Sequence, residues 1–324
     1  MELSLADWLI IIAYLVLSLW IGVYYRQKAS KNLESFFLGG RNLPWYIAGI
    51  SMVATTFAAD TPLAVTGLVG KNGIAGNWLW WNFLMGGMLT TFFFARLWRR
   101  SGVVTEVELI ELRYGGRPAR FLRGFKAIYL GLFMNMMIMG WVNFALVQIL
   151  SIFFGMDTDT ALLITGGLMV LTAVYSSLSG LLGVAMTDAV QFVIAMVSCV
   201  VLAVVVVHSD AIGGVEAMKA KLPPATLDFF PAITSGSELA STLALSFASF
   251  FAYVGIMWWS SWYPGQEPGG GGYVAQRMMS AKNERHALWG TLSFQVGHYA
   301  IRPWPWIIVG LCAVILYPEL QGND

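Results

Sequence analysis

Residues 51–68 read SMVATTFAADTPLAVTGL, an apolar run that Asp60 and Pro62 interrupt near its middle. Proline has no N–H to donate, and its ring clashes with the carbonyl four residues earlier, so backbone oxygens lose their helical partners there. A carboxylate inside a bilayer is also costly, by about 2.5–3.5 kcal/mol on the insertion scale. We therefore expect a helix that breaks halfway across a membrane. A simple proline kink, satisfied by Ser and Thr side chains, is the alternative.

The rest of the chain is equally apolar. Hydrophobic residues make up 57% of it and charged residues 11%, less than half of the roughly 25% charge of a soluble domain. A spanning helix needs about 20 apolar residues, and the runs that qualify predict an all-α, polytopic membrane protein of about eight transmembrane helices. These runs are 6–25, 44–70, 74–98, 122–154, 160–178, 184–207, 238–262 and 287–317.

The basic residues predict how these helices are oriented. Most of the 19 Lys and Arg residues fall in three loops, 25–43, 96–126 and the loop after residue 262. These loops share one side of the membrane if the spans alternate, and loops rich in Lys and Arg stay in the cytoplasm. We therefore expect an integral inner (plasma) membrane protein whose N-terminus lies outside. The two cysteines and three histidines have no disulfide or metal-site spacing.

Four separate segments carry a resemblance to a known family. They are FFLGGRNLPW (36–45), TEVELIELRYG (105–115), YSSLSGLLGVAMTDAVQ (175–191) and QRMMSAKN (276–283). In this order, and over most of the chain, they resemble the sodium/solute symporter family. Ser179-Gly180 and Gly183 depart from the third family motif, which has Gly-Gly and Ala at these places.

The resemblance implies the LeuT-type fold, in which two repeats of five helices have opposite topology. Residues 1–324 would then form a single transmembrane transporter domain with an extra N-terminal helix at 6–25. The first repeat would span 44–207, and 238–317 would hold the first two helices of the second. On this interpretation the inverted repeat is truncated after its seventh core helix. The missing helices include the one whose hydroxyl groups complete the main sodium site of the family.

The resemblance also implies a site for Na⁺ as the coupling ion. The backbone carbonyls of Ala54 and Phe57 would bind it, because a broken helix exposes such oxygens. Asp188 would lie near the cytoplasmic exit of the ion, although an Asp just before an apolar helix is equally typical of a helix cap. Thr61 and Trp80 fall where sugar-carrying members place polar contacts to the solute.

The last predicted span carries its own polar face. Gln295, His298 and Arg302 follow a spacing that stacks them on one side of a helix, and the prolines that come next predict a kink. His298 falls where sugar-transporting relatives have a basic contact, so we expect all three to bind solute. The alternative for Arg302 is a structural bridge to Asp60 or Glu267, because a buried charge needs a partner.

Residues 264–272 read PGQEPGGGG, which cannot form a regular helix. Because 239–262 is already long enough to cross a bilayer, this segment would suit an ordinary cytoplasmic loop. The family instead breaks its sixth core helix here. In that case Trp262 and Glu267 would line the solute pocket, an aromatic wall beside a carboxylate, together with Asp60.

These patterns predict a sodium-coupled secondary active symporter. It would import a small organic solute by alternating access, and aromatic faces with a few charged groups suit a sugar-like solute, a sugar acid or a zwitterion. The expected partners are the solute and the lipid bilayer, with no nucleic acid. No nucleophile–base constellation indicates an enzyme. Two alternatives stay open: a transporter-like sensor module of a signalling protein, and a non-functional symporter fragment.

Overall fold

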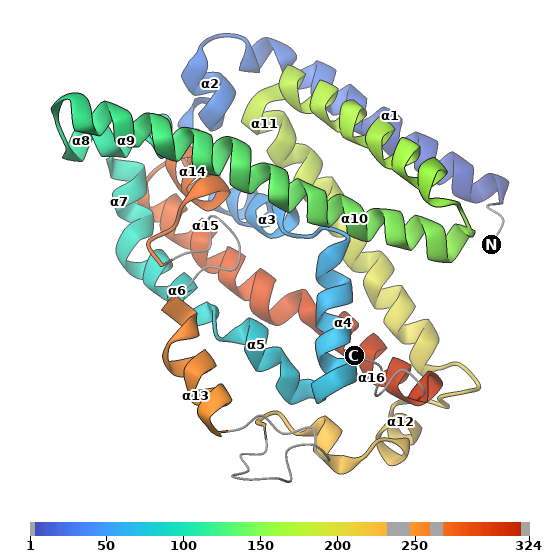
Figure 1. The fold of residues 1–324 in the computed structure, drawn as a ribbon. Coiled ribbons are helices and arrows are strands. Elements are labelled where there is room, and N and C mark those ends of the chain that lie inside the picture. Colours follow the sequence, from blue (N-terminus) through green and yellow to red (C-terminus); the bar gives the residue numbers. More distant parts are fainter. Residues whose placement is uncertain (1–3, 232–246, 260–267, 319–324) are drawn as a thin grey trace.

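The computed structural model describes residues 4–231, 247–259 and 268–318 (Figure 1). Within these ranges the protein is helical and contains no strand, apart from an isolated bridge between Leu43 and Ala281. The all-α prediction is confirmed.

The helix expected to break is broken. Helices α3 (Trp45–Thr55) and α4 (Asp60–Asn72) meet at an angle of 68°, and residues 56–59 join them. Pro62 lies in the first turn of α4, where the N–H that proline lacks would have no helical partner in any case. A second helix therefore starts at this place, and the interpretation as a simple kink is wrong.

The first helix packs along a long, bent one. Helix α1 (Leu5–Ala29) begins at a capping box formed by Ser4 and Asp7 and lies beside the first half of α11 (Thr158–Val207) (Figure 1). Helix α11 contains two predicted spans, 160–178 and 184–207, and bends between them where Gly180 has φ +56°. A Cβ on Gly180 would lie 2.7 Å from the Phe36 carbonyl oxygen, so this bend requires glycine.

The predicted span 74–98 is a series of short helices. Asn82, at the point of interruption, donates its side-chain amide to the Trp78 and Leu79 carbonyls at 3.1 and 2.8 Å, which competes with regular helical bonding. The elements are η2 (Ile74–Asn77), α5 (Trp78–Trp81), α6 (Leu84–Leu89), the π-turn η3 (Thr90–Phe94) and α7 (Ala95–Arg100). After α6 the helical turn widens into a π-turn, and one more short helix follows.

The remaining elements connect and cover these helices. Near the N-terminus they are α2 (Leu33–Leu38) and η1 (Gly39–Arg41); in the middle α8 (Glu108–Arg113), α9 (Gly116–Ile128), the π-turn η4 (Tyr129–Met134) and α10 (Asn135–Phe154). After α11 come α12 (Val215–Lys221), η5 (Pro224–Leu227), α13 (Phe247–Gly255), η7 (Met257–Trp259) and α14 (Gly272–Ser280). Arg277, which we counted as a loop charge, lies in α14 and is buried.

The last predicted span, 287–317, has a widened turn where the prolines predict a kink. It consists of α15 (Glu284–Val296), the π-turn η8 (Gly297–Ile301) and α16 (Pro303–Leu316), which continue as one apolar stretch. The Arg302 N–H donates to the Gly297 carbonyl at 2.9 Å, five residues back. A wider turn of this kind avoids the α-helical bonding that Pro303 cannot join.

Four helices among the described residues are long and apolar enough to cross a membrane, or five if α3 and α4 count as one bent span. The expected number of about eight spans stays a prediction, because α11 holds two of them and 238–262 lies partly outside the described ranges. The division into an extra helix and two repeats is also untested. Helix α3 packs against α11, α14 and α15, and Thr56, the first residue of the break, is buried.

Candidate functional site

Arg302 is the most deeply buried charge beside the broken helix. It is 0% exposed and lies where the π-turn η8 leads into α16. Its Nη1 donates to the Val53 carbonyl at 3.1 Å and contacts the Thr56 hydroxyl at 2.8 Å. Both acceptors belong to the end of α3, where helical carbonyls lack partners and attract a positive charge.

Three aromatic rings enclose the same guanidinium. The Phe57, Trp80 and Trp306 ring centroids lie 5.7, 5.6 and 5.3 Å from the Arg302 Cζ atom, within the range of cation–π attraction. The rings attract the charge of Arg302 but offer no hydrogen-bond acceptor to its N–H groups.

Thr56 joins the two sides of the break. Its hydroxyl lies 2.9 Å from the Val53 carbonyl and 3.1 Å from Nδ1 of His298, and its own carbonyl accepts from the Thr61 hydroxyl at 2.9 Å. His298 in turn stacks on Trp80, with centroids 4.9 Å apart. Four residues expected at the solute site are thus brought together: Thr61, Trp80, His298 and Arg302. We call them, with Thr56, the Arg302 cluster.

Asp60 and Gln295 lie next to this cluster but contact other groups. The Asp60 carboxylate accepts from Nε1 of Trp141 at 2.6 Å and from the Thr61 hydroxyl at 3.4 Å. No direct ion pair joins it to Arg302 among the residues that the structure describes, and the alternative bridge from Arg302 to Glu267 lies outside the described residues. Gln295 is buried against Gly87, where a Cβ would overlap its side-chain oxygen.

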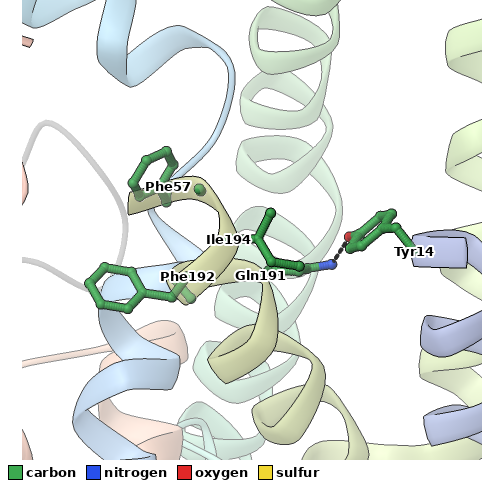
Figure 2. A pocket seen from close by; sticks show the side chains of 7 residues that line it. Tyr14, Phe57, Gln191, Phe192 and Ile194 are labelled. Carbon is green, nitrogen blue, oxygen red and sulfur yellow. Dashed lines mark hydrogen bonds between the residues drawn. The ribbon is translucent and has the colours of Figure 1, made fainter. Parts of the chain in front are cut away.

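The two residues expected to bind Na⁺ through their carbonyls line one cavity (Figure 2). It has a volume of about 370 Å³ and is lined by Tyr14, Ala54, Phe57, Gln191, Phe192, Ile194 and Ala195. The Ala54 carbonyl already accepts from the Phe57 N–H at 2.8 Å. Among the described residues no donor is found for the Phe57 carbonyl, so one of the two oxygens has its full capacity for a ligand.

Asp188 lies in a second buried cluster. Its carboxylate accepts from the Ser51 hydroxyl at 2.6 Å and pairs with Nη2 of Arg277 at 3.5 Å. Arg277 also donates to the Ser51 and Thr55 hydroxyls, at 3.1 and 3.2 Å. These four residues, the Arg277 cluster, connect α3, α11 and α14. Asp188 lies well inside α11, so the alternative of a helix cap is wrong.

Trp262 and Glu267 lie outside the described residues, but the chain on either side of them is placed. A Cβ on Gly86 of α6 would lie 3.0 Å from both the Trp258 carbonyl oxygen and the Pro268 ring. The Gly269 N–H donates to the Thr90 hydroxyl at 2.9 Å, and its carbonyl accepts from Nε1 of Trp98 at 2.7 Å. Trp258, Pro268 and Gly269, on either side of the undescribed residues, therefore pack against α6, η3 and α7. The broken sixth helix stays a prediction.

Sequence reasoning missed several members of both clusters. Thr56 stands within the interrupted stretch and could have been found from its position at the break. Ser51 and Thr55 lie only a few residues before Thr56 in the sequence, but they belong to the Arg277 cluster. Arg277 lies in the QRMMSAKN motif, but no local signal shows that it pairs with Asp188, which comes from a distant helix.

A model of the sodium:solute symporter family matches residues 36–318. The sodium/glucose cotransporter 1 of Sus scrofa is 25% identical over 329 residues, covering 97% of this chain and 48% of that protein. The sodium/glucose cotransporter 1 of Oryctolagus cuniculus is 27% identical over 217 residues, 67% of this chain and 32% of that protein. The chain thus spans at most about half the length of these relatives.

A solved structure has the same fold. It is the substrate-bound outward-open state of a Na⁺-coupled sialic acid symporter, with a TM-score of 0.74 and 19% sequence identity. The match covers 100% of this chain and 64% of that one. The likeness confirms the predicted fold class.

Proposed function

The chain belongs to the sodium:solute symporter family, and on this premise we propose that it is the transport part of a Na⁺-coupled symporter that imports a small organic solute. The observation that carries the proposal is the break between α3 and α4. Beside it lie the positively charged Arg302 cluster, which suits a solute, and the Phe57 carbonyl, which suits a cation. Discontinuous helices of this kind place ion and solute sites near the middle of the bilayer.

Na⁺ would bind to the carbonyls of Ala54 and Phe57. A hard cation prefers oxygen ligands, and the Phe57 carbonyl lacks a donor among the described residues. The cavity that Ala54 and Phe57 line would give the ion access (Figure 2). Asp188, held by Arg277, would act on the ion as it leaves rather than bind it in the resting site.

The solute would bind at the Arg302 cluster. Trp80 and His298 offer a flat aromatic surface, and hydroxyl, imidazole and guanidinium groups supply hydrogen bonds. Asp60 and Gln295 border the cluster, while Trp262 and Glu267 stay predicted contacts. The relatives are named for glucose and the solved neighbour for sialic acid, which supports a sugar-like solute, a sugar acid or a zwitterion.

Transport would follow from rocking of the helices around the break. With Na⁺ bound, the solute site faces outward; reorientation then exposes both sites to the cytoplasm. One charge that crosses 100 mV supplies about 2.3 kcal/mol, so each Na⁺ drives solute uphill. The orientation with the N-terminus outside and the two-repeat division belong to this proposal.

The test is uptake by the full-length protein reconstituted into liposomes. Radiolabelled glucose, glucuronate, proline and lactate are offered with an inward Na⁺ gradient, and again with K⁺ in place of Na⁺. We expect one of these classes to accumulate only with Na⁺, and the accumulation to disappear when an ionophore collapses the gradient. Equal uptake in Na⁺ and K⁺, or none above protein-free liposomes for any solute, would contradict the proposal.

A further inference from the structure

The hydrogen bonds of Arg302 are distributed unevenly over its guanidinium group. Nη1 contacts both the Val53 carbonyl and the Thr56 hydroxyl. Nε and Nη2 are buried and have no hydrogen-bond partner among the described residues. These two atoms form the side-on edge of the group, whose two parallel N–H bonds match the two oxygens of a carboxylate.

Arg302 also makes no direct ion pair in the part of the chain that the structure describes. The ion pairs found there involve other basic residues, and Asp60 directs its oxygens to Trp141 and Thr61. A charge buried in a membrane protein is strongly unfavourable unless it is paired and hydrogen-bonded. The aromatic rings around it offset only part of that cost.

The three rings also decide which ligand group can complete the pairing. They lie around the guanidinium and offer it no hydrogen-bond acceptor, and Nη1 is occupied, so a new partner has to bind at the Nε–Nη2 edge. Two neighbouring hydroxyls of a neutral sugar would satisfy the N–H groups but leave the charge uncompensated. A carboxylate satisfies both and neutralises the charge.

We infer that the transported solute carries a carboxylate, and that Arg302 binds it through Nε and Nη2. This inference rests on the proposed function and narrows it, because neutral sugars are excluded as the main solute. The remaining groups of the Arg302 cluster, the His298 ring and the Thr61 hydroxyl, would contact the rest of the molecule.

The experiment compares each acid with its own amide, which has nearly the same shape but no charge. Na⁺-dependent uptake into liposomes that contain the full-length protein is measured for glucuronate and glucuronamide, lactate and lactamide, and proline and prolinamide, with glucose as a neutral reference. We expect at least one acid to be transported, and its amide about tenfold to a hundredfold less well. Na⁺-driven uptake of glucose or an amide in preference to every acid would overturn the inference and leave the proposed function standing. Absence of any Na⁺-driven uptake would overturn both.

Variants of Arg302 separate binding from a purely structural role. In Arg302→Gln the acid and its amide should be taken up at similar rates, because the preference for the charge is lost. Should that variant fail to fold, Arg302→Lys keeps the positive charge but cannot form two parallel bonds, so it should lose most of the preference. The melting temperature of each variant is measured alongside. An unchanged preference for the acid in a folded variant would overturn the inference.

Discussion

The two deeply buried arginines of this protein, Arg277 and Arg302, have opposite surroundings. Arg277 pairs with the Asp188 carboxylate and donates hydrogen bonds to the Ser51 and Thr55 hydroxyls. Arg302 is enclosed by aromatic rings and holds the end of α3 with one nitrogen only. Both contact the end of the same helix, Arg277 at Ser51 and Thr55 and Arg302 at Val53 and Thr56. The first is internally neutralised and the second keeps an edge for a ligand.

This difference indicates that the two clusters along α3 have different roles, one in stabilising the fold and one in transport. The Arg277 cluster ties α3 to α11 and α14 and involves charges that compensate each other. The Arg302 cluster lies at the break, where the chain leaves backbone oxygens and a guanidinium edge to be completed by bound species. A charge that serves the fold is expected to lower stability when it is removed, and a charge that serves transport is expected to lower uptake.

The largest effect on stability should come from Arg277→Met. It leaves the Asp188 carboxylate buried and unpaired, which typically costs about 3–5 kcal/mol. Thermal unfolding of the purified protein in detergent measures this. The matched double variant Arg277→Met with Asp188→Leu removes both charges and should recover most of the loss. If Arg277→Met is as stable as the unaltered protein, the Arg277–Asp188 pair does not contribute to stability.

Arg302→Met should destabilise the protein less than Arg277→Met, when no solute is present. No carboxylate is left behind, and the change removes the charged hydrogen bonds to Val53 and Thr56, worth about 1.5–3 kcal/mol, together with the cation–π contacts to three rings. The same unfolding measurement compares the two variants side by side. If Arg302→Met proves the more destabilising of the two, Arg302 is a structural charge like Arg277 and the contrast between the clusters fails.

Two neighbouring threonines offer a finer comparison. Thr56→Val removes the hydroxyl shared by Arg302 and His298, so we expect the KM for the solute to rise about fivefold to tenfold, the equivalent of one hydrogen bond of about 1–1.5 kcal/mol. Thr55→Val removes a hydroxyl of the Arg277 cluster; it should lower the melting temperature and leave the KM unchanged. Uptake kinetics and unfolding are measured for both. The reverse pattern would show that the solute binds at the Arg277 cluster and not at the Arg302 cluster.

The smallest effect is expected at an exposed pair. Arg100 and Glu284 are 2.8 Å apart, with side chains 64% and 38% exposed, and solvent screens such charges. Glu284→Gln should therefore change neither the melting temperature nor uptake. A clear loss of stability or of uptake would show that this exposed ion pair contributes more than its burial predicts. Burial would then be a poor basis for contrasting Arg277 with Arg302.

Much of the architecture followed from local patterns in the chain. Asp60 and Pro62 predicted the break, because proline's missing N–H is tolerated only in the first turn of a helix. The apolar runs predicted α1, α10 and both halves of α11, since a bilayer demands about 20 apolar residues per helix. The spacing of Gln295, His298 and Arg302 predicted a buried polar face, and all three are buried.

The partners of the buried charges were beyond the reach of the sequence. Asp188 and Arg277 are far apart in the chain, and both the prediction of a helix cap and that of a loop arginine failed for them. One alternative for Arg302 was a bridge to Asp60, which instead accepts from Trp141. Where a helix breaks depends on residues within one or two turns, so the chain itself determines it. Which charge meets which carboxylate depends on the faces that distant helices turn toward each other, and the packing of α3 between α11, α14 and α15 decided that.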